Sequence, residues 1–209
     1  MTRFLLAPLM AITPLVLAAP VAAAPTPAVP ATGDLGLVQR HLQALDTMTA
    51  AFVQTDRAGK VLTGTLTLKK PGRIRFQYQQ GVPILIVAEG GALTFVDYSV
   101  KQVQRWPIKN SPLAVLLDPD RDITRYAHVV SSDARTISVD AVDPKHPEYG
   151  RITLIFAREP AAPAGLTLEG WVMLDSQGNR TTVRLADQKF NVAVPDNSFA
   201  WTDPRRKGR

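Results

Sequence analysis

The sequence contains no cysteine, and this absence excludes several kinds of chemistry at once. The 209-residue chain can form no disulfide, bind no zinc through thiolates, use no thiol nucleophile and carry no lipid anchor on a cysteine. Its length predicts a single domain, in which about 70% of the unfolded surface can be buried without covalent cross-links. We therefore expect stability to come from a hydrophobic core.

The usual landmarks of catalysis are missing as well. There is no Gly-x-Ser-x-Gly nucleophile motif, and no glycine-rich phosphate loop precedes a helix. Asp140 and Asp143 are close in sequence, but no base or orienting residue accompanies them. Asp143, His146 and Glu148 are interrupted by prolines, which favours a surface loop over a metal site. The sequence therefore predicts neither an enzyme nor a metal-binding protein.

Long apolar runs are confined to the N-terminal region. Arg3 is the only charged residue before Asp34, and Val21-Ala22-Ala23 supplies the small residues that a signal peptidase reads. This pattern predicts a signal peptide over residues 1–23 and a flexible lead-in over residues 24–33. An uncleaved membrane anchor is the alternative, because the apolar span is long enough. The repeated prolines and small residues favour cleavage and export.

Basic residues outnumber acidic ones, 24 to 18, which gives a net charge of +6. The excess gathers in a basic tail, residues 205–209. Such a tail can bind anionic headgroups, nucleic acid or an acidic protein surface, and a merely solvated tail is the alternative. Because an exported protein rarely meets nucleic acid, we do not expect nucleic-acid binding.

Residues 34–49 have the spacing of an amphipathic helix, with Asp34 as its N-cap. His41 falls on the polar side of this expected helix. The apolar stripe consists of Leu35, Val38, Leu42, Leu45 and Met48.

From there on, apolar and polar residues mostly alternate, with turn residues every eight to twelve positions, which is typical of an antiparallel meander. A short second helix is expected over residues 113–117, with Ser111 as N-cap and Pro112 in its first position. Strands are predicted over residues 51–57, 61–69, 73–79, 83–88, 92–98, 100–106, 127–131, 135–142, 151–157, 166–174 and 181–189, with a last one over 198–202.

These elements predict a mainly β fold, a curved antiparallel β-barrel that is not closed, with about ten or eleven strands and helices as a lid. Residues 34–204 form this one domain. Inward-facing apolar side chains should enclose a hollow, because a binding cavity is usually apolar with few polar groups. We expect its wall to include Leu66, Leu68, Ile74, Phe76, Tyr78, Leu85, Val87, Phe95, Trp106, Leu113, Leu116, Leu117 and Trp171.

The most specific pattern in the chain is LTLKKPGRIRFQY, residues 66–78, a strand, a Lys-Pro-Gly turn and a second strand. It resembles the signature of the periplasmic outer-membrane lipoprotein carriers, the LolA family. FVQ at 52–54, IVAEG at 86–90 and NSPL at 110–113 resemble further family elements in the same order. The likeness covers residues 35–204 and is strongest over residues 52–117.

This resemblance implies a periplasmic carrier whose hollow receives the acyl chains of lipoproteins. It implies acylated lipoproteins as cargo, an inner-membrane ABC lipoprotein-release complex that supplies them, and an outer-membrane acceptor. It implies no cofactor, and we expect a monomer. Many family members have arginine before the conserved proline, where it ties the lid through backbone carbonyls. Here Lys70 precedes Pro71, and because lysine lacks the planar fork of arginine, we expect these two residues to gate a more easily opened lid.

Two other functions remain open at this stage. A lipoprotein- or lipid-sensing periplasmic module of the same architecture would share the hollow but deliver nothing. A periplasmic enzyme acting on lipids would need a nucleophile with its base, and the sequence shows none.

Overall fold

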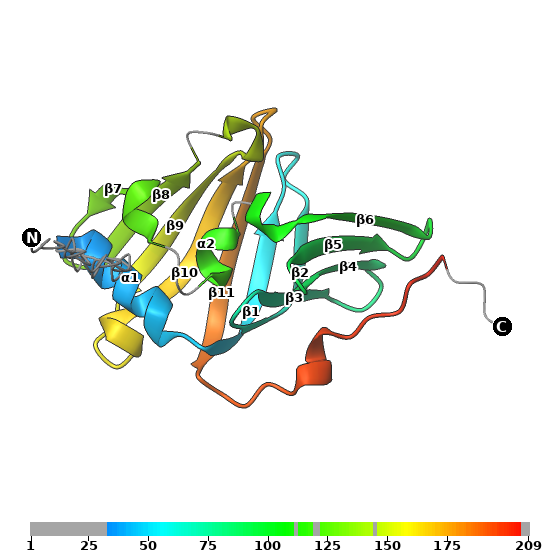
Figure 1. Ribbon diagram of the computed structural model, residues 1–209, viewed down its shortest axis with the longest axis horizontal. Helices are drawn as coiled ribbons and strands as arrows, with labels where there is room; N and C mark the ends of the chain where they lie inside the picture. The colour runs from blue at the N-terminus through cyan, green and yellow to red at the C-terminus, as the bar shows by residue number, and fades with distance from the viewer. Residues whose placement is uncertain (1–32, 111–112, 119–121, 144–145, 206–209) are drawn as a thin grey trace, which may run out of the picture.

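The computed structural model describes residues 33–110, 113–118, 122–143 and 146–205. The predicted signal peptide, all but the last residue of the lead-in, the predicted cap residues Ser111 and Pro112, and residues 206–209 of the basic tail lie outside this part. Within it, eleven strands form one antiparallel sheet with short helices on one face (Figure 1). The prediction of a mainly β fold with ten or eleven strands is confirmed.

The strands alternate with short connections. Helix α1 spans Gly33–Ala44 and α2 spans Ala114–Leu117. Five short 3-10 helices are η1 (Ile108–Asn110), η2 (Ile123–Arg125), η3 (Pro147–Tyr149), η4 (Pro163–Gly165) and η5 (Asp196–Phe199). The strands are β1 (Thr47–Thr55), β2 (Val61–Lys69), β3 (Arg73–Tyr78), β4 (Ile84–Glu89), β5 (Ala92–Asp97), β6 (Gln102–Pro107), β7 (Ala127–Ser132), β8 (Thr136–Val142), β9 (Arg151–Arg158), β10 (Leu166–Leu174) and β11 (Arg180–Phe190).

The sheet consists of two meanders joined at one seam. Its strand order is β6-β5-β4-β3-β2-β1-β11-β10-β9-β8-β7, so β1 pairs with β11 while β6 and β7 are the edges. The chain leaves the sheet at one edge, β6, and enters it again at the other edge, β7. Helix α2 lies on this crossing, over the concave face of the sheet (Figure 1). The barrel is therefore not closed. The segment that connects edge strand β6 to edge strand β7 carries α2 and so forms part of the lid.

An aromatic cluster packs across the seam on the concave face. Phe52 of β1 makes edge contacts with Phe76 and Tyr78 of β3, with ring centroids 5.5 Å and 5.2 Å away. Phe76 in turn contacts Trp171 of β10, 6.1 Å between centroids. Such edge-to-face pairs add about 0.5–1.5 kcal/mol each beyond the area they bury. Gly64 makes room for Phe52, because a Cβ atom at Gly64 would lie 2.7 Å from the Phe52 ring.

The first helix is shorter than the predicted one. It ends at Ala44, and β1 begins at Thr47, so Met48 belongs to the strand. Met48, Ala50 and Phe52 are all buried at a spacing of two residues, which fits a strand and not a helix. The Asn191 side chain stabilises this change of direction, because it donates to the Ala44 carbonyl and accepts from the Asp46 amide.

Two predictions about side chains of α1 were wrong. Asp34 lies inside the first turn and does not cap the helix; its carboxylate pairs with Arg158 at 2.7 Å. His41 was expected on the polar side, but it is fully buried. Its ring lies near Phe156 and Phe190, and its Nδ1 bonds to the carbonyl oxygen of Pro163 in the η4 turn at 2.8 Å. Burial lowers the His41 pKa, so the ring is a neutral core residue.

The C-terminal segment forms a second, smaller core on the opposite face of β3–β5. The strand predicted over residues 198–202 does not form, and η5 replaces its start. Val194 and Phe199 pack with Val96 beneath the segment, and Trp201 adds to this cluster. The Asp196 carboxylate fastens the segment through ion pairs with Lys69 and Arg73 at 2.8 Å and 2.7 Å. Apart from β1, the strands begin and end within two residues of the predicted bounds.

The second core predicts that the C-terminal segment contributes to global stability. Phe199 is fully buried, so Phe199→Ala should lower the free energy of unfolding by about 3–5 kcal/mol. Equilibrium urea unfolding followed by tryptophan fluorescence measures this change. Asn197→Ala, at an exposed position of η5, is the control and should stay close to the wild type. Equal stabilities of the two variants would mean that the segment is not part of the cooperative fold.

Candidate functional site

An apolar hollow of about 260 Å³ opens on the concave face, between the β6 edge, the start of α2 and η3. Most of its wall is aliphatic or aromatic. The lining residues are Gln54, Phe76, Ile86, Leu93, Trp106, Leu113, Glu148, Tyr149, Trp171, Met173, Thr181 and Val183. This volume lies just below the usual range of small-molecule pockets, about 300–1,000 Å³. In this closed form the hollow accommodates one narrow apolar group and not several.

The structure places the residues predicted for the cavity wall in four groups. Phe76, Trp106, Leu113 and Trp171 line the hollow directly. Phe95 is half-buried on the same face, where it pairs with Ile86. The largest group is buried in the core that adjoins the hollow beneath the helices, and it consists of Leu66, Leu68, Ile74, Tyr78, Leu116 and Leu117.

The fourth group, Leu85 and Val87, lies on the other face of the sheet. Both residues pack with Val96 and Phe199 in the core beneath the C-terminal segment. Strand β4 is apolar at almost every position, so alternation could not tell which set faces inward. The inward residues are the alternate ones, with Ile86 on the wall of the hollow. The structure therefore separates Leu85 and Val87 from the hollow.

Two kinds of wall residue were not predicted from the sequence. Met173 and Val183 are neighbours of Trp171 on the same face, one at two positions along β10 and one across to β11. Strand alternation from Trp171 carries enough information to find Met173. Glu148 and Tyr149 lie in η3, where no periodic pattern exists. Only the folded chain shows that this turn reaches the hollow.

Polar groups occupy two places in the hollow. On its wall, Gln54 accepts a hydrogen bond of 2.8 Å from the Tyr78 hydroxyl, and burial raises the pKa of Tyr78 to about 12, so that this phenol stays neutral. In η3, His146 contacts Glu148 at 3.0 Å and stacks on Tyr149, with centroids 4.7 Å apart. The hydrogen bond from His146 lowers the Glu148 pKa. An apolar chain can therefore lie against the aliphatic and aromatic wall, while Gln54 and the η3 turn offer polar groups beside it.

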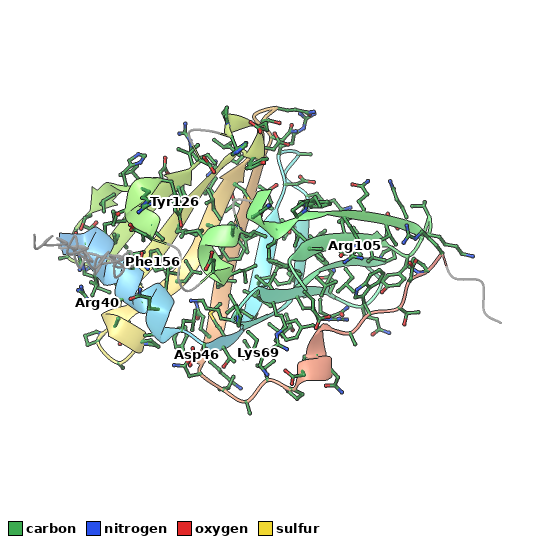
Figure 2. All side chains as sticks on the ribbon, viewed as in Figure 1. Arg40, Asp46, Lys69, Arg105, Tyr126 and Phe156 are labelled. Carbon is green, nitrogen blue, oxygen red and sulfur yellow. The ribbon has the colours of Figure 1, made fainter. Side chains whose placement is uncertain are left out.

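The turn between β2 and β3 connects the sheet to both helices. Lys70 donates through its Nζ to the carbonyl of Leu42, in the last turn of α1. The Gly72 amide donates to the carbonyl of Leu117, the last residue of α2, at 2.9 Å. The Lys70 amide donates to the Asp46 carbonyl at 2.8 Å, and Figure 2 shows Asp46 near Lys69 at this end of the sheet. Both helices are therefore fastened to one short turn.

The Lys70 side chain is largely withdrawn from water, and this changes its acidity. Burial lowers the pKa of Lys70 from 10.5 to about 8, although the negative charges of Asp46 and Asp118 oppose the shift. Near neutral pH the amine is mostly charged, and burial makes this charge unfavourable. This charge destabilises the closed arrangement relative to a neutral donor at the same position.

Within the described ranges, no three His, Asp or Glu side chains gather as ligands for an ion. Over the same ranges, no helix has the length and hydrophobicity needed to cross a membrane.

The buried amine of Lys70 predicts how stability depends on pH. Between the folded pKa of about 8 and the ordinary value of 10.5, the unfolded chain binds more protons than the folded chain. This group's contribution to the free energy of unfolding therefore increases as the pH rises through that window, and below it the full cost of the buried charge is present. Urea unfolding at about pH 7 and about pH 10 should show the wild type gaining stability relative to Lys70→Met.

The same substitution at exposed Lys60 is the control, because it removes no buried charge. The wild type should gain little over Lys60→Met across the same pH range. If the stability of the wild type relative to Lys70→Met does not change with pH, Lys70 is not held in an apolar environment.

Known proteins share both the sequence pattern and the fold. An outer-membrane lipoprotein carrier protein from Legionella pneumophila (strain Lens) is 28% identical over 179 residues, which cover 81% of this chain and 85% of the relative. The protein of the same name from Chromobacterium violaceum is 27% identical over 168 residues, 76% of this chain and 78% of the relative.

A DUF1329 family protein from Desulfovibrio piger has the same fold, with a TM-score of 0.51 at 11% identity over 80% of this chain and 95% of that one. Residues 43–202 match the family model described as outer membrane lipoprotein carrier protein LolA, and this range contains every strand of the sheet. The chain therefore belongs to the LolA family.

Proposed function

We propose that this protein is a periplasmic carrier that binds the acyl chains of lipoproteins released from the inner membrane and delivers them to an outer-membrane acceptor. One observation supports this function most directly: an apolar hollow opens on the concave face beside a core that is covered by short helices. The family match and the names of the relatives agree with it. The wall offers hydrophobic contact and no nucleophile paired with a base, so we propose binding and not catalysis.

The energetics favour a cavity that is mostly closed in the absence of cargo. Each buried methylene contributes about 0.8 kcal/mol, so an always open cavity would hold long acyl chains almost irreversibly. Here the first chain enters the hollow at Trp106 and Trp171, and further chains displace α1 and α2 from the core. Leu66, Leu68, Ile74, Phe76 and Tyr78 then become the wall of the enlarged cavity. Loss of helix packing offsets part of the acyl burial, and cargo remains transferable.

The Lys70–Gly72 turn is the proposed gate. Lys70 contacts α1 and Gly72 contacts α2, with Pro71 between them, so a change in this turn reaches both helices. Lysine makes fewer directional bonds than arginine, and its charge is buried here. Both properties favour a lid that opens easily.

The remaining parts of the proposal concern partners. Acylated lipoproteins are the cargo, an inner-membrane ABC complex supplies them, and a more hydrophobic acceptor at the outer membrane draws them off. The carrier acts as a monomer and uses no cofactor.

Filling the hollow should reduce cargo binding. Thr181 lines the hollow on β11, and Thr181→Phe places an aromatic ring in its roughly 260 Å³. We expect at least a tenfold weaker affinity for a synthetic triacylated lipopeptide, about 1.4 kcal/mol, by displacement of a fluorescent fatty-acid probe. Thr65→Phe, at an exposed position of β2, is the control and should bind as the wild type does.

Equal affinity of both variants would place acyl binding elsewhere on the protein. Release of newly made lipoproteins from spheroplasts, with the purified protein added, then separates a carrier from a sensor. A carrier makes the lipoprotein appear in the soluble fraction, and Thr181→Phe lowers its yield. Mass spectrometry of the recovered lipopeptide should show intact acyl chains, whereas deacylated product would indicate an enzyme.

The gate can be tested by hydrogen exchange. Lys70→Ala removes the bond to the Leu42 carbonyl, so amides in residues 113–117 and in the last turn of α1 should exchange faster than in the wild type. Lys70→Arg should slow them, because a guanidinium offers more donors to backbone carbonyls. Lipoprotein transfer should change together with exchange. If exchange and transfer are both the same in all three proteins, Lys70 does not gate the lid.

A further inference from the structure

The outer face of the sheet, opposite the lid, has a feature that acyl binding does not use. Two adjoining hollows of about 500 Å³ and 660 Å³ lie over β1 and β8–β11, and both are lined by Arg180, Thr182 and Arg184 of β11. We name their union the arginine groove. It runs from the β1–β2 and β10–β11 turns, at the top of Figure 1, across the back of the sheet to the start of β8.

The groove has a strong excess of positive charge. Five arginines line it, against two carboxylates, those of Asp56 and Glu169. Three of the arginines already have partners or lie at the ends of the groove: Arg57 donates to Asn179 at 2.7 Å, Arg158 pairs with Asp34, and Arg135 stands at the β7–β8 turn. The other two, Arg180 and Arg184, are exposed and form no ion pair with any residue that the structure describes.

The two exposed arginines have the spacing of an extended ligand. They lie four residues apart on one face of β11, which separates their Cα atoms by about 13 Å. Between Arg180 and Arg184, Thr182 is the one β11 side chain on the outer face, so only a small side chain separates the two arginines. Beside Arg184 stands Gly170, where a Cβ atom would lie 2.1 Å from the Val183 carbonyl oxygen. On the β10 side, therefore, no side chain stands directly across from Arg184.

We propose that the arginine groove binds an extended acidic segment of a partner protein. Arginine pairs with carboxylates in a bidentate geometry, and carboxylates four residues apart in an extended peptide lie about 13 Å from each other, which matches the spacing of the two arginines. A flat anionic membrane is a poorer match, because the arginines line hollows in the sheet and do not project as a plane. The groove and the lid lie on opposite faces, so the protein can bind the acidic segment and an acyl chain together.

Such a site affects the rate and the orientation of association between the carrier and its partners. Charge complementarity across a partly exposed interface mainly accelerates and orients association, and it weakens as salt increases. An acidic segment near the place where cargo is loaded or delivered would raise the local concentration of the carrier without contact to its acyl site. The inference does not depend on what the concave hollow carries, because no residue of the groove other than Val183 lines that hollow.

Fluorescence anisotropy of the full mature chain with a labelled twelve-residue Glu-Ser repeat peptide tests the proposal. We expect saturable binding at about 20 mM salt that weakens at about 200 mM. Arg180→Gln with Arg184→Gln should weaken it about tenfold or more. The charge-matched control is Arg40→Gln with Arg105→Gln, two exposed residues on α1 and β6 (Figure 2) that do not line the groove, and it should weaken binding less than twofold.

Three results would overturn the proposal. Equal losses in the two double variants would show non-specific attraction to net charge. Binding of vesicles with one quarter anionic phospholipid that depends on Arg180 and Arg184, without peptide binding, would assign the groove to a membrane surface. Equal or tighter binding of a twelve-nucleotide single-stranded DNA at the same arginines would make it a general polyanion site. Far-ultraviolet circular dichroism confirms that each variant is folded.

Discussion

The pairing of β1 with β11 is the contact on which the rest of this protein depends. It joins the two meanders into one sheet and leaves the two edges, β6 and β7, far apart in the strand order. The chain between these edges then has to cross the concave face, and α2 lies on that path. Phe76 of β3 supports the seam from within, because its ring contacts Trp171 of β10 on the other side. A lid over an apolar surface thus follows from connectivity, before any residue is specialised for cargo.

The closed interior explains why the lid matters. Six of the residues predicted for the cavity wall are buried by the protein's own side chains, and the hollow of about 260 Å³ lies beside them. The interior is therefore both a core and a latent binding surface. Its helices are short and are fastened at the Lys70–Gly72 turn, where a buried amine opposes tight closure. Under the proposed function, the contacts that stabilise the fold also control access to the cavity.

The outer face of the sheet has two distinct regions. Over β3–β5 it is covered by the C-terminal segment, which Asp196 fastens to Lys69 and Arg73. Over β8–β11 it carries the arginine groove. Alternation along the strands makes this division possible, because each strand presents one set of side chains to the lid and another to the outside.

The sequence by itself determined the mainly β architecture, nearly all strand bounds and the turn at Lys70–Gly72, because alternation and turn residues are local signals. It also identified Phe76, Trp106, Leu113 and Trp171 for the hollow. It could not determine which side chains of β4 face inward, since an almost wholly apolar strand has no polar side to mark the outside. Leu85 and Val87 were therefore predicted to line the hollow, whereas they lie on the other face of the sheet. Nor could it show that helix α1 stops at Ala44, because Met48 fits a helical spacing and a strand spacing equally well. Only the tertiary structure decided three other features: the burial of His41, the approach of Glu148 and Tyr149 to the hollow, and the position of Arg180 and Arg184 in one groove with Arg57 and Arg135. Each of these depends on contacts between segments that lie far apart in the chain.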